Sequence, residues 1–172
     1  TLIAIGVMGI AAAIGGLRGV LDSAPQISVE DVIPEGYKSF IYDKDGNLLT
    51  QLYQPETNRI QKSISEMPEV LQNPFIALED ERFREHNGID PKGIVRAFVV
   101  GVTSGDFSEG ASTITQQLLK INVFGGGDED SLLLKFKRKF QEQYLALELE
   151  KTMSKDEILE AYLNTINLGA ST

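Results

Sequence analysis

Residues able to move a proton or bind an anion gather in three parts of the sequence. Glu79 lies four residues before Phe83 and seven before His86, so all three share one face if the segment is helical. A carboxylate beside an aromatic ring is partly desolvated, which suits it to proton transfer near neutral pH. The alternative is that these charges form an ordinary solvated helix face. Asp80 and Arg84 have the spacing of a helical ion pair on another face.

The second group lies in the segment KFKRKFQEQYLALELEK, residues 135–151. Four cations lie in its first half, although a helix favours cations at its C-terminal end. Arg138 and Glu142 are spaced as an i, i+4 pair, so a helix here would present a guanidinium to a phosphate with a carboxylate one turn beyond. The alternative is an exposed helix covered with salt bridges.

The third group is the stretch GASTITQQLLK, residues 110–120, which has three hydroxyls, two amides and an amine but no acid. Ser112 or Thr113 can cap a helix whose other polar residues face water. A start rich in Ser and Thr followed by a Gln pair also suits a helix-turn-helix that reads DNA bases. A third interpretation is a site for a sugar and pyrophosphate, to which Lys120 adds positive charge. The spacing alone does not choose among the three.

Composition excludes several classes of site. The net charge is -9, from 16 basic and 25 acidic residues, which argues against nucleic acid as a partner. The chain has no cysteine and one histidine, so disulfides, thiolate chemistry and a histidine-rich metal cage are excluded. The sequence contains no phosphate loop and no Gly-x-Ser-x-Gly, His-Glu-x-x-His or Ser-x-x-Lys motif.

The N-terminus carries a signal for location. Residues 2–17 contain no charge, and a spanning helix needs about 20 apolar residues. Because the chain opens on Thr1, we expect a transmembrane helix over residues 1–21 whose first residues are missing. A signal-peptide core and a buried soluble helix are the alternatives.

The rest of the chain predicts a mainly α-helical head. Residues 22–62 form a juxtamembrane linker with a β-hairpin around Asp45-Gly46. Helices are expected over residues 73–88, where Pro74 follows an N-cap, and 91–101. A short helix follows Ser112 or Thr113, and two longer ones cover residues 132–151 and 155–166, the last behind a Ser154/Glu157 capping box.

Four motifs, in order, resemble the peptidoglycan glycosyltransferase (transglycosylase) domain of class A penicillin-binding proteins and monofunctional peptidoglycan glycosyltransferases. The first, Glu-Asp-x-x-Phe-x-x-His-x-Gly-x-Asp, is matched by Glu79, Asp80, Phe83, His86, Gly88 and Asp90. Residues 110–120 match the second. The third is matched by Arg138, Lys139, Glu142, Leu145, Ala146, Leu149 and Glu150, and the fourth by Lys155, Ile158, Leu159, Glu160, Tyr162, Leu163 and Asn164.

The resemblance implies a lysozyme-like helical head over residues 63–172, which we expect to be truncated at its C-terminus. It implies polymerisation of lipid II, with inversion at the muramyl anomeric carbon and release of undecaprenyl pyrophosphate. Glu79 would be the general base. Glu142 would be the second catalytic carboxylate and would act near the donor's pyrophosphate, directly or through a divalent metal. The implied substrate-binding residues are Asp80, His86, Arg96, Ser112, Thr113, Gln116, Gln117, Lys120 and Arg138.

The resemblance also implies partners and a location. The implied partners are lipid II, the growing glycan chain, the cytoplasmic membrane and cell-wall synthesis proteins. The implied location is the cell membrane, with a single-pass anchor and an extracytoplasmic head. No protein-bound metal or obligatory cofactor is expected, although Mg²⁺ or Mn²⁺ could accompany the pyrophosphate. The apolar run over residues 94–102 would lie near the bilayer, unless it is an ordinary core helix. A muramidase that uses Glu79 as an acid, and a non-catalytic membrane-anchored binder of precursor or of a cell-wall partner, remain as alternatives.

Overall fold

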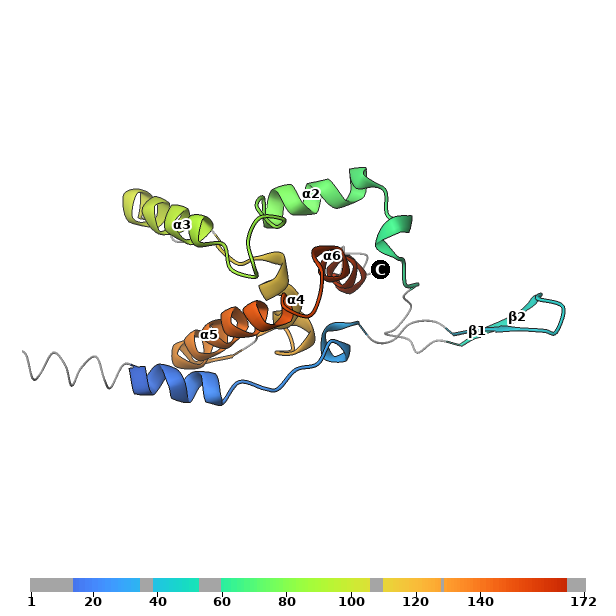
Figure 1. Ribbon diagram of the computed structural model, residues 1–172, viewed down its shortest axis with the longest axis horizontal. Helices are drawn as coiled ribbons and strands as arrows, with labels where there is room; N and C mark the ends of the chain where they lie inside the picture. Colours follow the sequence, from blue (N-terminus) through green and yellow to red (C-terminus); the bar gives the residue numbers. More distant parts are fainter. Residues whose placement is uncertain (1–13, 35–38, 53–59, 106–109, 128, 167–172) are drawn as a thin grey trace, which may run out of the picture.

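The computed structural model describes residues 14–34, 39–52, 60–105, 110–127 and 129–166. Helices dominate these residues, with one small sheet, as the sequence predicts (Figure 1). The elements are η1 (Glu30–Val32), β1 (Ser39–Tyr42), β2 (Leu48–Leu52), η2 (Ile64–Glu66), α2 (Glu69–Glu79), α3 (Pro91–Ser104), α4 (Ile114–Asn122), α5 (Leu132–Leu149) and α6 (Lys155–Thr165).

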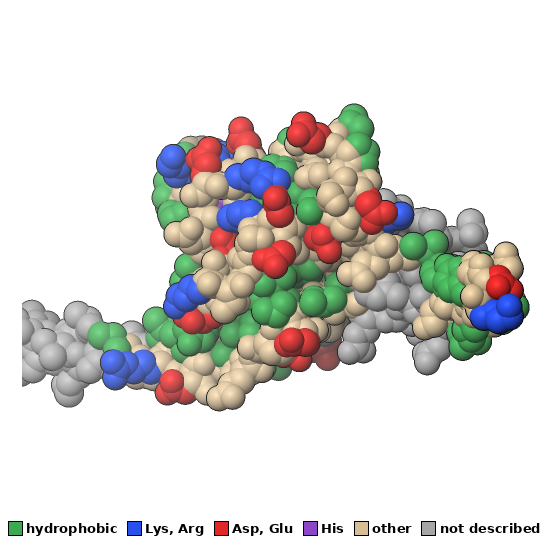
Figure 2. Space-filling model, turned by 45° about the vertical axis from the view of Figure 1, so that its right-hand side comes forward, with side chains coloured by type: hydrophobic (Ala, Val, Ile, Leu, Met, Phe, Trp, Pro, Cys, Tyr) green, Lys and Arg blue, Asp and Glu red, His purple; other side chains and the backbone are tan. Residues whose placement is uncertain are grey.

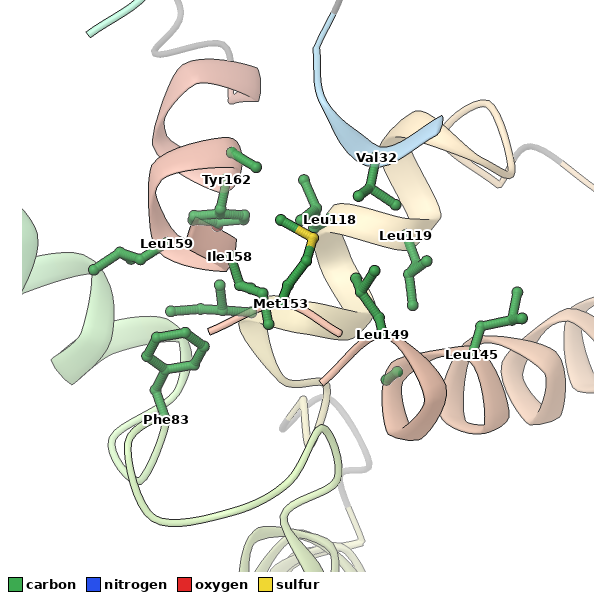
Figure 3. Close-up of a cluster of buried hydrophobic side chains, with 13 residues drawn as sticks. Val32, Phe83, Leu118, Leu119, Leu145, Leu149, Met153, Ile158, Leu159 and Tyr162 are labelled. Atoms are coloured by element: carbon green, nitrogen blue, oxygen red, sulfur yellow. The ribbon is translucent and has the colours of Figure 1, made fainter. Parts of the chain in front are cut away.

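The short helix α4 is at the centre of the head and packs against α5, α6 and η1 (Figures 1 and 3). Its Ile114, Leu118 and Leu119 are fully buried. Around them lie further buried apolar side chains, including Phe83, Val32, Leu145, Leu149, Met153, Ile158 and Leu159. This core fixes α4, and with it the polar stretch at residues 110–120.

The predicted hairpin is confirmed. Strands β1 and β2 pair antiparallel, with Ser39 opposite Leu52 and a bulge at Ile41/Tyr42. Gly46 has φ 82°, the left-handed conformation that this turn requires of its glycine. The hairpin projects away from the helical head in Figure 1, and both of its strands are exposed.

The predicted helix over residues 73–88 is wrong at both ends. Helix α2 begins at Glu69, and Pro74 lies inside it. Pro74 has no N–H to donate to the Val70 carbonyl one turn earlier, and the helix tolerates this loss because Val70 is exposed to water. The helix stops after Glu79, because Asp80 adopts an extended backbone with φ -161°. Glu79, Phe83 and His86 therefore do not share a helical face.

The other helix boundaries follow their local signals. Asp90 is the N-cap of α3, as predicted, but the helix runs to Ser104 and ends where Gly105 is left-handed, with φ 74°. Thr113 caps α4, accepting from the N–H of Gln116. The capping box of Ser154 and Glu157 opens α6, as predicted.

Residues 14–22 are helical and lie beside α5 in Figure 1, and Gln141 of α5 donates to the Val20 carbonyl at 3.1 Å. Residues 1–13 of the expected transmembrane helix lie outside the described residues. Within the described parts of the chain, no helix combines the length and apolar character that crossing a bilayer requires.

Candidate active site

The loop that follows α2 is organised by Asp80. This carboxylate is 7% exposed, and it accepts from the backbone N–H of Ile114 at 3.0 Å, at the N-terminus of α4. His86 Nε2 lies 2.9 Å from both carboxylate oxygens. Because His86 Nδ1 accepts from the N–H of Gly88, its Nε2 carries the proton and donates to Asp80. Asp80 and His86 thus join the loop to α4.

Gly88 brings the same loop against α4 and α5. Its carbonyl accepts from Thr113 Oγ1 at 2.8 Å and from Gln116 Nε2 at 3.0 Å. Its φ is 90°, and a Cβ at this position would lie 2.6 Å from the Ala146 carbonyl oxygen. Only glycine permits both this conformation and this approach.

An ion pair closes the far end of the loop. Arg82 Nη2 lies 2.6 Å from Asp90 Oδ2, and Arg82 Nε donates to the same oxygen at 3.1 Å. These hydrogen bonds from Arg82 hold the pKa of the Asp90 carboxyl below its usual range, although burial opposes the shift. The predicted pair of Asp80 with Arg84 does not form, because Asp80 is turned to His86 while Arg84 pairs with Asp156.

Glu79 is the last residue of α2 and is exposed. Its Oε2 accepts from Gln117 Nε2 of α4 at 2.9 Å. Since Asp80 and His86 bond to each other, the neighbour that contacts Glu79 is an amide, not the histidine that the helical spacing suggests. The carboxylate keeps access to solvent and is free to meet a substrate.

A second cluster surrounds Glu142, which is 1% exposed on α5. Arg138 Nη1 donates to Glu142 Oε1, and Lys139 Nζ lies 3.2 Å from Glu142 Oε2. Lys139 also donates to Ser112 Oγ at 2.6 Å and to Gln116 Oε1 at 3.0 Å. The cluster ties α5 to the polar residues at the start of α4.

The cluster is rich in positive charge. Burial lowers the pKa of Lys139, Glu142 opposes this shift, and the charges of Arg138 and Lys120 add to it. Burial also disfavours the charged guanidinium of Arg138, but hydrogen bonds to Glu129 and Glu142 outweigh it and raise the pKa. A further anion at this cluster would therefore stabilise its charged amine.

A cavity of about 210 Å³ lies between the end of α2, the start of α3 and the residues that precede α4. Its lining includes Glu79, Arg96 and Ser112, and Ser112 is bonded to Lys139. Arg96 extends from α3 and is 3.8 Å from Glu81 Oε2. A ligand in this cavity would meet the carboxylate of Glu79 and the hydroxyl of Ser112, which accepts from the cluster's lysine.

The structure brings most of the predicted site residues into two sets, each joined by hydrogen bonds. One contains Glu79 and Gln117, and the other contains Ser112, Gln116, Arg138 and Glu142. Asp80, His86 and Thr113 are buried in the loop contacts, and Lys120 is close enough to lower the pKa of Lys139. Lys139 is the central residue that the prediction omits, although its i, i+3 spacing from Glu142 is visible in the sequence.

The arrangement around Glu142 does not suit a metal ion held by the protein. Both carboxylate oxygens already contact cations, which would repel another. Among the described residues, no three His, Asp or Glu side chains converge as metal ligands. On the face shown in Figure 2, acidic and basic side chains are interspersed and no broad basic surface suits a nucleic acid.

The sequence is similar to several curated penicillin-binding proteins. Penicillin-binding protein 1A of Clostridium novyi (strain NT) is 44% identical over 161 residues, which are 91% of this chain and 18% of that protein. The protein of the same name from Clostridium perfringens (strain 13 / Type A) is 42% identical over 154 residues, 87% of this chain and 22% of the relative. That of Escherichia coli (strain K12) is 46% identical over 129 residues, 75% of this chain and 14% of the relative. The chain therefore spans between 14% and 22% of the length of these relatives.

Residues 45–172 match the transglycosylase family. This range includes both carboxylates of the site, the loop after α2 and the cation cluster on α5. It covers more than half of the chain. The chain belongs to the transglycosylase family.

Proposed function

We propose that this chain is the glycosyltransferase part of a cell-wall synthase that polymerises lipid II. The growing glycan chain would be the donor and lipid II the acceptor, with inversion at the muramyl anomeric carbon and release of undecaprenyl pyrophosphate. The observation that carries the proposal is the cavity that Glu79 and Ser112 line together. It brings an exposed carboxylate and a cation-bound hydroxyl to one cavity.

Glu79 would act as the general base. Its carboxylate would take the proton from the 4-hydroxyl of the acceptor's N-acetylglucosamine as that oxygen attacks the anomeric carbon. Glu79 is exposed, and Gln117 holds one of its oxygens, which leaves the other available for the hydroxyl. Arg96 lines the same cavity and would contact the substrate.

The cluster on α5 would bind the donor's pyrophosphate. Arg138, Lys139 and Lys120 supply positive charge where negative charge grows on the leaving group, and preorganised cations are most effective when partly buried. Glu142 would hold Arg138 and Lys139 in place and not meet the phosphate itself, since it is buried between them. These residues do not suit a metal bound by the protein.

The exposed face of α3 supports a location at a membrane. Val95, Phe98, Val99 and Val102 are each more than half exposed, so the predicted alternative of an ordinary core helix is wrong. An apolar helix face next to the cavity suits the arrival of a substrate with a lipid tail. We propose that the head lies on the extracytoplasmic surface, anchored by the N-terminal segment, and that its helical fold is lysozyme-like.

The test is polymerisation of labelled lipid II by the detergent-solubilised full-length protein. We expect long glycan and undecaprenyl pyrophosphate from the native protein, and a loss of rate of about 100-fold or more in Glu79→Gln. Glu69→Gln is the matched control, because Glu69 is exposed in the first turn of the same helix.

Other results would identify the alternatives. Equal rates in Glu79→Gln and the native protein would overturn the assignment of the base. Cleavage of preformed glycan without polymerisation would identify a muramidase. Precursor binding without turnover, before and after the substitution, would identify a binding protein.

A further inference from the structure

We propose that Tyr162 is a positioning residue for the base and acts through Gln117. The hydroxyl of Tyr162, the amide of Gln117 and the carboxylate of Glu79 form a hydrogen-bonded chain across α6, α4 and α2. The inference rests on the proposed function, because it assigns Glu79 as the base. Tyr162 would not touch the substrate.

The geometry of the chain is direct. Tyr162 Oη lies 3.2 Å from Gln117 Oε1, and Gln117 Nε2 lies 2.9 Å from Glu79 Oε2. The three residues are separated by 38 and 45 positions in the sequence, so only the folded helices bring them together. Each link joins a different pair of helices.

The direction of the chain follows from the chemistry of the three groups. An ionised carboxylate only accepts, so the amide must present its NH₂ group to Glu79. The amide oxygen then faces Tyr162, whose hydroxyl donates to it. In the reversed amide, two oxygens would face each other at Glu79. The carboxylate fixes the orientation of the amide, and the hydroxyl of Tyr162 then holds the amide oxygen in place.

Tyr162 is itself rigidly held. It is 3% exposed, and its ring meets that of Phe75 edge to face, with centroids 6.5 Å apart. Phe75 lies one turn before Glu79 on α2, so the same tyrosine packs against the helix that carries the base. Burial and the charge of Glu79 raise the pKa of Tyr162 to about 12, so the hydroxyl keeps its proton at neutral pH.

A carboxylate that rotates freely spends less time in the geometry that accepts the substrate's proton, and small misplacements of reacting groups are costly. Removing only the hydroxyl of Tyr162 should therefore lower the rate of the chemical step and leave substrate binding nearly unchanged. The effect should vanish where Gln117 no longer transmits it.

The experiment is a double-mutant cycle in the full-length protein, with Tyr162→Phe, Gln117→Met and the double variant, assayed by polymerisation of labelled lipid II. Phe keeps the ring that packs on Phe75, and Met keeps the approximate volume of Gln. We expect kcat to fall about tenfold in Tyr162→Phe, with KM within about twofold. In the Gln117→Met background, Tyr162→Phe should have no further effect. Tyr42→Phe is the control, because Tyr42 lies in the exposed hairpin.

The outcomes separate this inference from the proposed function. An unchanged kcat in Tyr162→Phe, or an effect of equal size in both backgrounds, would overturn the role of Tyr162 while polymerisation by the native protein still supports the proposed function. A larger KM with unchanged kcat would also overturn it and make Tyr162 a binding residue. Absence of polymer from the native protein would overturn the proposed function and the positioning role together.

Discussion

The carboxylate of Asp80 accepts a hydrogen bond from the backbone N–H of Ile114, so the residue after the proposed base binds the N-terminus of the helix that bears Gln117. The contact is favourable because the first N–H groups of a helix lack internal partners and attract negative charge. It couples the end of α2 to the start of α4. The position of Glu79 relative to Gln117 therefore depends on a buried neighbour that need not meet the substrate.

Substitution of Asp80 should be costly for folding. In Asp80→Ala, the N–H of Ile114 and Nε2 of His86 lose their buried acceptor, and we expect the free energy of unfolding to fall by about 2–4 kcal/mol. Urea denaturation followed by circular dichroism measures it. Asp156→Ala removes an exposed carboxylate paired with Arg84 and should cost about 0.5 kcal/mol or less. Equal losses in the two variants would contradict the structural role of Asp80.

The pair of Arg82 and Asp90 predicts a dependence on pH. The folded pKa of Asp90 is lowered, so its contribution to stability is complete above its unfolded pKa of about 3.9 and is lost as the pH falls through the folded value. Asp90→Asn should reduce the free energy of unfolding by about 1–3 kcal/mol at pH 7. Urea denaturation at pH 7 and at pH 3 should show this difference shrinking in acid, whereas a constant difference would contradict the assignment.

Substitution of Gly88 tests the contribution of the close contact between the loop and Ala146 of α5. Gly88→Ala would strain a left-handed backbone, by about 1–2 kcal/mol, and force Ala146 to move, by about 1–3 kcal/mol more. Gly105→Ala is a matched control, because Gly105 has φ 74° with no atom within 4 Å of an added Cβ. Thermal unfolding should show a larger loss for Gly88→Ala. A loss no larger than that of Gly105→Ala would show that the contact contributes nothing.

Glu129 should compete with an anion for Arg138. Its carboxylate oxygens lie 2.8 and 2.9 Å from Arg138 Nε, and this contact holds the pKa of Glu129 below its usual range. We expect Glu129→Gln to bind inorganic pyrophosphate about 3- to 10-fold more tightly in isothermal titration calorimetry, because a competing charge is removed. Asp130→Asn removes the same charge from the next residue, which is exposed. A similar gain in both variants would show a general charge effect.

The sequence predicts those elements whose signals are local. The capping box of Ser154 and Glu157, the N-cap of Thr113 and the turn at Gly46 each operate within four residues, and each forms. Helix α2 differs from the prediction at both ends. Pro74 is typical of a helix start but lies inside the helix, and the end of the helix depends on Asp80 reaching Ile114, 34 residues away.

The distinction between local signals and contacts of distant residues also holds for the site. The pair of Arg138 and Glu142 is visible as an i, i+4 spacing, whereas the contacts of Lys139 with Ser112, 27 residues apart, and of Gln117 with Glu79 need the folded core. The motifs locate these residues in the chain but say nothing of which are exposed. Burial shows that Asp80 and Glu142 face neighbours of the same chain, while Glu79 faces solvent.

No residue of α2 is buried, whereas α4 lies in the centre of the core. The backbone amides of α4 should thus exchange their hydrogens with solvent only when the whole head unfolds, while those of α2 should exchange through smaller openings. The position of the helix that ends in Glu79 therefore depends on a few contacts, chiefly Phe75 with Tyr162 and Asp80 with Ile114.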